Sequence, residues 1–226
     1  MATHLDLEEQ EQLDALKHFW KQWGHWITWA LIVALAAYAG WNGWQYWQRR
    51  QATLASALYE EIDRAAQTGD VARVERALAD MKDRYGGTVY AAHGALLAAR
   101  TFNDKDKGPE ARAALAWVAE KAPLDALQAV ARLRLASLQT GDKAYDEALK
   151  TLAANFPESL APLAADRRGD VLLLQGKRKE AAVEFGKAYQ GLDAEAGEYR
   201  RLIGYKLNAL GIDPDAAGTR PAGAAS

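Results

Sequence analysis

The sequence predicts an all-α chain in which a single N-terminal transmembrane helix precedes a stack of helical hairpins. Residues 22–48 contain no Lys, Arg, Asp or Glu. After them come Ala- and Leu-rich segments whose apolar residues recur every three or four positions, and the runs of β-branched residues typical of strands are missing. We therefore divide the chain into a tail (1–21), a membrane segment (22–48), a helical domain (51–210) and a second tail (211–226).

The membrane segment is apolar on every face at its centre, residues 27–40, which suits hydrocarbon better than water. A helix from Trp26 to Trp44 is roughly 28 Å long, close to the thickness of the hydrocarbon core of a bilayer. Indole rings prefer the headgroup layer, and seven of the eight Trp residues lie in two clusters near the ends of the segment. They are Trp20, Trp23, Trp26 and Trp29 on one side and Trp41, Trp44 and Trp47 on the other.

A cleaved signal peptide is the alternative, because Ala37, Tyr38 and Ala39 have the small-x-small form that signal peptidase accepts. Cleavage is disfavoured because the preceding tail is acidic and the apolar run is longer than a signal core. Basic residues flank the segment equally, two on each side, so charge does not set its orientation. A large domain that follows such a helix is translocated largely regardless of its charge. We therefore expect a cytoplasmic amino terminus and an external helical domain.

The first tail mixes acidic residues with apolar ones, and Leu13, Leu16 and Trp20 fall on one face at helical spacing. This spacing predicts a juxtamembrane helix. Two interpretations stay open for it: a cytoplasmic docking or degradation tag, and a solvated lead-in to the membrane.

The helical domain is predicted to contain four antiparallel hairpins and a capping helix near residues 196–210. Turn signals separate the helices, among them Gly69-Asp70, Gly141-Asp142 and Gly176. The hairpins are expected over residues 51–85, 88–121, 124–155 and 160–190. The second tail is rich in Pro, Gly and Ala and is predicted to be disordered.

An internal repeat is visible in the last hairpin, where Gly169, Ala181, Phe185 and Ala188 follow one another at spacings of 12, 4 and 3. This spacing resembles the tetratricopeptide pattern, in which small residues let helices approach and a ring packs against the next repeat. The preceding hairpin keeps part of the pattern at offsets of 36 and 33 residues, close to the 34-residue repeat. A tetratricopeptide-like solenoid is therefore favoured over a generic helical bundle.

Composition and motifs argue against several function classes. A net charge of −2 and a pI near 6.1 do not favour nucleic-acid binding, and the absence of Cys excludes disulfides and thiolate metal sites. The four His residues include no pair at metal-ligand spacing, and no catalytic or phosphate-binding motif occurs. We expect no enzymatic activity, no cofactor and no small-molecule substrate.

Two sets of residues are candidate partner-binding sites. Ala36, Gly40 and Gly43 lie at i, i+4 and i+7, so they form a strip of small residues against which another membrane helix can pack closely. The second set is basic and lies on first helices, which line the concave face of such stacks. It consists of Arg132, Arg134, Arg167 and Arg168. One interpretation is a groove that pairs with carboxylates of a partner, and the other is ordinary surface charge paired with its neighbours.

Several segments make the chain resemble the YfgM family of ancillary SecYEG translocon subunits. They are Leu13-Asp-Ala-Leu-Lys-His-Phe-Trp20, Gly40-Trp-Asn-Gly-Trp-Gln-Tyr-Trp47, Ala131-Arg-Leu-Arg-Leu-Ala136 and Ala165-Asp-Arg-Arg-Gly169. The resemblance implies a single-pass inner-membrane scaffold with a periplasmic helical domain. It also implies association with the translocon and with a PpiD-type periplasmic chaperone. The alternative function is a membrane-tethered regulator that holds a soluble cytoplasmic partner through the acidic N-terminal tail.

Overall fold

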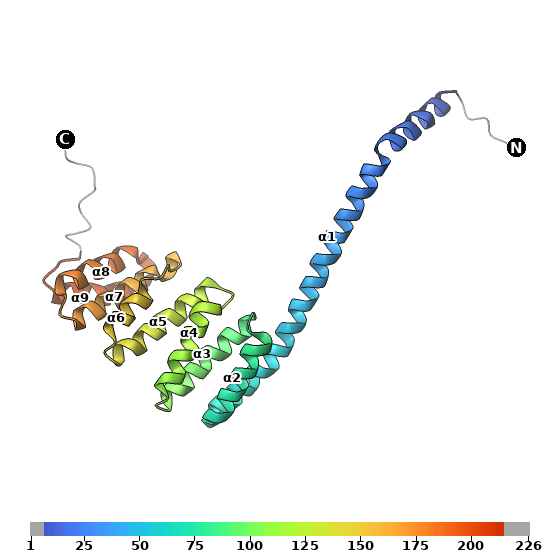
Figure 1. Ribbon diagram of the computed structural model, residues 1–226. Helices are drawn as coiled ribbons and strands as arrows, with labels where there is room; N and C mark the ends of the chain where they lie inside the picture. Colours follow the sequence, from blue (N-terminus) through green and yellow to red (C-terminus); the bar gives the residue numbers. More distant parts are fainter. Residues whose placement is uncertain (1–6, 215–226) are drawn as a thin grey trace, which may run out of the picture. The chain divides into compact units, whose positions relative to one another are not determined.

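The computed structural model describes residues 7–214, and every regular element in that range is a helix (Figure 1). The all-helical prediction is therefore confirmed for this part of the chain. Residues 1–6 of the first predicted tail and 215–226 of the second lie outside the described residues. The α-helices are α1 (Leu7–Thr68), α2 (Val71–Tyr85), α3 (Val89–Asp104), α4 (Gly108–Lys121), α5 (Asp125–Gly141), α6 (Tyr145–Leu152), α7 (Ala161–Leu174), α8 (Arg178–Gly191) and α9 (Gly197–Ala209). Two short 3₁₀ turns, Glu158–Leu160 and Ala194–Ala196, precede α7 and α9.

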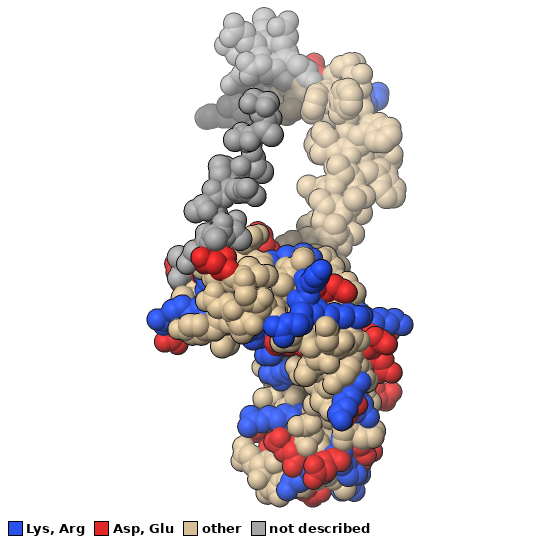
Figure 2. Space-filling view, turned by 90° about the vertical axis from the view of Figure 1, so that its left-hand side faces the viewer, with Lys and Arg blue, Asp and Glu red and all other residues tan. Residues whose placement is uncertain are grey.

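The chain divides into two compact units, Met1–Gln51 and Ala52–Ser226, so that the boundary falls within α1. In the first unit, α1 carries the uncharged run 22–48 and leaves its large apolar side chains exposed. Figure 2 shows this part of α1 almost entirely in tan. Within residues 7–214 no helix is both long enough and apolar enough to cross a membrane. The predicted transmembrane helix is therefore not confirmed.

The second unit is built from consecutive antiparallel helices. The end of α1 packs against α2, because its buried residues share a cluster with those of α2 and Glu61 pairs with Arg73 at 3.1 Å. The following hairpins are α3 with α4, α5 with α6 and α7 with α8. Each hairpin also contacts the next, through α2 with α3, α4 with α5, α6 with α7 and α8 with α9. From α2 to α8 the helices lie within a few residues of the predicted hairpin ranges, but α1 runs without a break from Leu7 to Thr68, across the predicted starts of the membrane segment and of the helical domain.

One turn geometry recurs at the end of each first helix. One residue just beyond the helix has a positive φ. The backbone N–H of the next residue donates to the carbonyl five residues earlier, which satisfies an otherwise unpaired helix-end carbonyl. The left-handed residues are Gly69, Asp106, Lys143, Gly176 and Gly211. The corresponding bonds are Asp70 to Ala65, Lys107 to Phe102, Ala144 to Gln139, Lys177 to Leu172 and Ile212 to Leu207, at 2.8 to 3.1 Å. The last helix, α9, which was predicted as a capping helix near residues 196–210, ends with the same turn geometry.

Small residues let neighbouring helices approach closely, both within a hairpin and between hairpins. Ala181, Phe185 and Ala188 of α8 are fully buried, as the repeat spacing predicts. A Cβ atom on Gly94 would lie 2.8 Å from Sδ of Met81, and one on Gly169 would lie inside contact distance of the Phe185 ring. Burying a ring of this size contributes about 2 to 3 kcal/mol.

A buried polar network fixes the last helix. Asp166 on α7 is only 1% exposed, and its two carboxylate oxygens accept from the Tyr199 hydroxyl and from Nζ of Lys206, each at 2.7 Å. Lys206 also donates to Asp170 at 2.6 Å. Burial and the hydrogen bond to Asp166 raise the pKa of the Tyr199 hydroxyl, so this group stays a donor. The network therefore ties α9 to α7 through charge as well as through apolar packing.

Candidate functional site

Pockets lie between neighbouring first helices of the second unit. One of about 320 Å³ lies between α3 and α5, and one of about 210 Å³ lies between α5 and α7. Ser137 on α5 lines both, so the two pockets adjoin, and we refer to them together as the inner groove. The first pocket is lined by Leu96, Ala99, Arg100, Asn103, Leu115, Arg134, Ser137 and Leu138. The second is lined by Ala136, Ser137, Thr140, Leu152, Arg167, Asp170 and Val171.

Arg134 and Arg167 are the two predicted site residues that line the inner groove. Arg134 is exposed on α5 and forms no ion pair with any described residue. Arg167 lies 33 residues later on α7, is about half exposed and is 3.4 Å from Asp170. Because Lys206 holds Asp170 at 2.6 Å, the longer contact leaves the Arg167 guanidinium available to a further carboxylate.

Arg132 does not line the inner groove, and its guanidinium is held by contacts within the domain. Its guanidinium donates to the carbonyl of Ala119 near the end of α4 at 2.9 Å and to the Gln128 side chain at 3.0 Å. The carbonyl end of a helix carries partial negative charge, so a guanidinium is well placed there. Arg132 therefore joins the second hairpin to the third.

Arg168 has a similar role one hairpin later. It donates to the carbonyl of Leu152, the last residue of α6, at 2.9 Å and pairs with Glu184 on α8 at 2.6 Å. Lys187 donates to the same carboxylate. Burial raises the pKa of Glu184, but hydrogen bonds from Lys187 and Arg168 outweigh burial and leave this pKa below its ordinary value.

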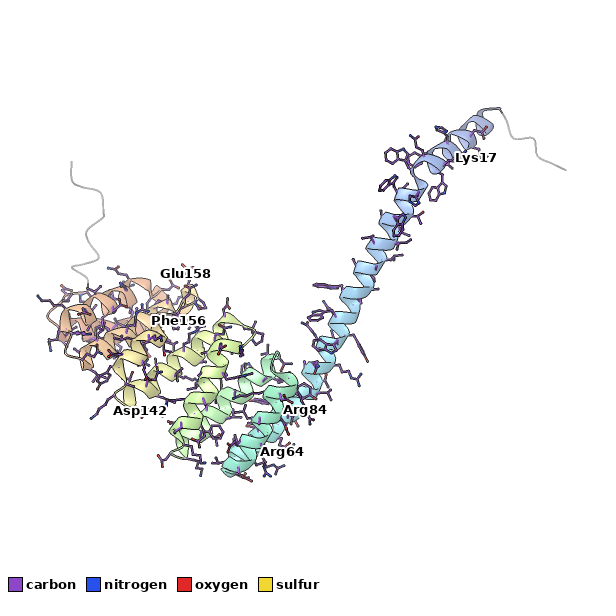
Figure 3. The ribbon with its side chains drawn as sticks, viewed as in Figure 1. Lys17, Arg64, Arg84, Asp142, Phe156 and Glu158 are labelled. Carbon is purple, nitrogen blue, oxygen red and sulfur yellow. The ribbon has the colours of Figure 1, made fainter. Side chains whose placement is uncertain are left out.

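The second unit also carries an ion pair on its surface between hairpins. Arg112 on α4 pairs with Asp142. Asp142 lies in the turn after α5 (Figure 3). This contact again links neighbouring repeats and leaves the inner groove unobstructed. No group of three His, Asp or Glu side chains in the described part of the chain could hold a metal ion.

The predicted strip on α1 is open. Ala36, Gly40 and Gly43 are exposed, and nothing lies within 4 Å of a Cβ atom built on either glycine. A partner helix can therefore approach the α1 backbone closely along this strip.

Comparison with known proteins identifies the architecture. The family model described as a tetratricopeptide repeat-like domain matches residues 17–212. A Neisseria gonorrhoeae protein named ancillary SecYEG translocon subunit is 32% identical over 211 residues, which are 93% of this chain and all of that protein. This chain belongs to the family of ancillary SecYEG translocon subunits. The predicted tetratricopeptide-like solenoid and the resemblance read from the sequence are thereby confirmed.

A second member of the family shows the same relationship over a shorter stretch. The Escherichia coli K12 protein of the same name is 34% identical over 133 residues, 58% of this chain and 62% of its own length. No solved structure gives a significant match to the chain.

Sequence reasoning did not select Arg100, which lines the first pocket opposite Arg134. Its side chain is 78% exposed and is 3.7 Å from Asp104, which is 60% exposed and lies one turn further along α3. Arg100 lies 34 residues before Arg134, one repeat length, and this spacing was the available signal.

Proposed function

We propose that the protein is a membrane-anchored interaction subunit of the SecYEG translocon. The observation that carries this proposal is the similarity to a named translocon subunit over 93% of the chain and the whole of the relative. A tetratricopeptide-like stack suits this role, because each hairpin adds surface to an extended binding face without a catalytic centre.

The proposed anchor is residues 22–48 of α1. Apolar side chains around the helix are largely exposed, among them Trp26 at 70%, Leu31 at 60% and Val33 at 62%. Water does not favour such a surface, whereas hydrocarbon does, and the two Trp clusters suit the headgroup layers. The small residues Ala36, Gly40 and Gly43 form the proposed contact with a neighbouring membrane helix.

The proposed topology puts the amino terminus in the cytoplasm and the helical domain in the periplasm. There the domain would link exported proteins to a PpiD-type chaperone, the partner that the sequence resemblance implies. Arg134 and Arg167 are the proposed contacts of the domain, since both line the inner groove. Arg132 and Arg168 would support this face by holding successive hairpins together.

Affinity purification of the full chain from gently solubilised membranes tests the association. We expect the SecYEG complex to co-purify, and its absence at every detergent tried would contradict the proposal. Alkaline extraction should leave the chain in the membrane pellet. Recovery of a soluble form that begins at Gly40 would instead favour a cleaved signal peptide.

Protease treatment of spheroplasts tests the topology. The helical domain should be digested without lysis if it faces the periplasm. Protection of the domain would favour the alternative function, a regulator that holds a cytoplasmic partner through its acidic N-terminal tail.

A further inference from the structure

The inner groove combines an apolar floor with a concentration of positive charge. Leu96, Leu115 and Leu138 contribute to the first pocket, and Arg100 and Arg134 come to it from opposite helices. No acidic side chain lines that pocket. Guanidinium groups beside an apolar cavity suit a ligand that carries both a carboxylate and an apolar side chain.

The charge extends into the neighbouring pocket. Arg167 continues the basic row from α5 to α7, and the uncharged Ser137 lines both pockets. Two acids lie beside this row, Asp104 at 3.7 Å from Arg100 and Asp170 at 3.4 Å from Arg167. Both arginine side chains nevertheless remain about half exposed or more, and Lys206 holds Asp170 more closely, at 2.6 Å. Three exposed guanidinium groups, on three successive first helices, therefore line the two adjoining pockets of the inner groove.

The geometry points to an extended acidic segment of a partner protein as the occupant of the inner groove. An apolar side chain enters the pocket between α3 and α5, and carboxylates pair with Arg100, Arg134 and Arg167. This inference rests on the proposed function as an interaction subunit and names the chemistry of the segment that it binds.

The helix spacing sets the pattern of that segment. Packed helices lie roughly 10 Å apart, and an extended polyproline-like chain rises about 3.1 Å per residue with three residues per turn. A carboxylate at every third residue therefore meets successive arginines from one side of the segment. A single turn of helix is too short to reach from α3 to α7, since helices rise only about 1.5 Å per residue.

Fluorescence anisotropy with the purified full chain in detergent tests the proposal. The probe is a labelled synthetic peptide with Glu at every third position and one Leu between two of them. Its first control has Gln in place of each Glu, and its second has the same composition with the Glu residues clustered at one end. The spaced peptide should bind most tightly, and binding should weaken as salt increases because the contacts are ionic.

Variants locate the site. Arg100→Glu, Arg134→Glu and Arg167→Glu should each weaken binding about tenfold or more, as expected for loss of a charge-assisted contact. The matched control is Arg84→Glu, which makes the same change of charge at an exposed position on α2 (Figure 3). Ser137→Trp keeps every charge but adds a bulky ring where the two pockets adjoin, and it should also abolish binding.

The outcomes separate this inference from the proposed function. Equal losses in Arg84→Glu and Arg134→Glu would show attraction by overall charge and would overturn the groove. Failure of the spaced peptide to bind, or binding that survives both Ser137→Trp and Arg134→Glu, would overturn it as well. If the SecYEG complex still co-purifies in those cases, the proposed function stands without the groove. If the peptide binds as expected but the complex never co-purifies, the groove stands and the proposed function fails.

Discussion

Gly169 on α7 and Phe185 on α8 are in such close contact that a Cβ atom at position 169 would lie 2.5 Å from Cε1 of the ring. Phe185 is fully buried, so the ring has no free space into which to move. The pair fixes the distance between the two helices of the last complete hairpin.

Gly169→Ala should therefore destabilise the domain, although alanine favours helices. We expect the free energy of unfolding to fall by about 1 to 3 kcal/mol from overpacking, and Phe185→Ala to lower it by about 3 to 5 kcal/mol through the cavity it leaves. Chemical denaturation of the solubilised full chain measures both. Gly186→Ala is the matched control, because nothing lies within 4 Å of its added Cβ. It should be neutral or stabilise the domain by up to about 1 kcal/mol. Equal effects at 169 and 186 would contradict the packing argument.

Lys206→Met should release α9. The variant leaves the buried carboxylate of Asp166 with the Tyr199 hydroxyl but without its cation, and breaking a buried pair in this way costs about 3 to 5 kcal/mol. Limited proteolysis should then cut near residues 193–197 before the rest of the domain. Arg201→Met on the same helix removes an exposed cation 3.9 Å from Glu198 and should leave the digestion pattern unchanged.

Acid should weaken the domain partly through Glu184. Its pKa is lowered because hydrogen bonds from Lys187 and Arg168 outweigh the opposing effect of burial. A carboxyl group whose folded-state pKa is depressed contributes stability above its unfolded value, here near 4.5, and this contribution is lost as pH falls through the folded pKa. The stability difference between the wild type and Glu184→Gln should therefore shrink as urea titrations move from about pH 7 to about pH 3. A difference that stays constant over this range would contradict the assignment. The exposed Glu180→Gln serves as the control on the same helix.

Arg168→Gln should reduce stability, whereas Arg134→Gln should not. Arg168 holds the Leu152 carbonyl and Glu184, and leaving such groups unpaired costs about 1 to 3 kcal/mol. Arg134 has no ion pair among the described residues, so its replacement should change the unfolding free energy by less than about 0.5 kcal/mol. Thermal unfolding compares the two. Equal melting temperatures would mean that the Arg168 contacts contribute nothing.

The contrast between these arginines shows where sequence reasoning is sufficient. Spacing correctly identified the buried Ala181, Phe185 and Ala188, because apolar periodicity and repeat geometry are recorded directly in the chain. It could not separate Arg132 from Arg134. The two lie on opposite sides of one helix, and only packing decides which side meets the Ala119 carbonyl and which meets the groove.

The positions of the turns are also only partly predictable from the sequence. Gly176 marks its own left-handed turn, but the equivalent positions in the two preceding repeats are Asp106 and Lys143. Lysine gives no local signal for a positive φ. The nearby Gly141 therefore led to a turn predicted two residues before the observed one. These turns form because the helices on either side must return against one another, which is a tertiary requirement.

Gly40→Leu should weaken co-purification of partners without preventing membrane insertion. Nothing lies within 4 Å of the added Cβ on α1, so the helix itself accepts the larger side chain. Leucine is at least as soluble in hydrocarbon as glycine, but it keeps a neighbouring backbone at a distance, and packing rather than hydrophobicity drives helix association in lipid. The measurement is recovery of the SecYEG complex with the variant, normalised to the amount of chain in the membrane fraction. Ala34→Leu adds similar bulk on another side of the helix and should leave recovery unchanged. If both variants recover every partner as the wild type does, the strip of Ala36, Gly40 and Gly43 is not the contact face.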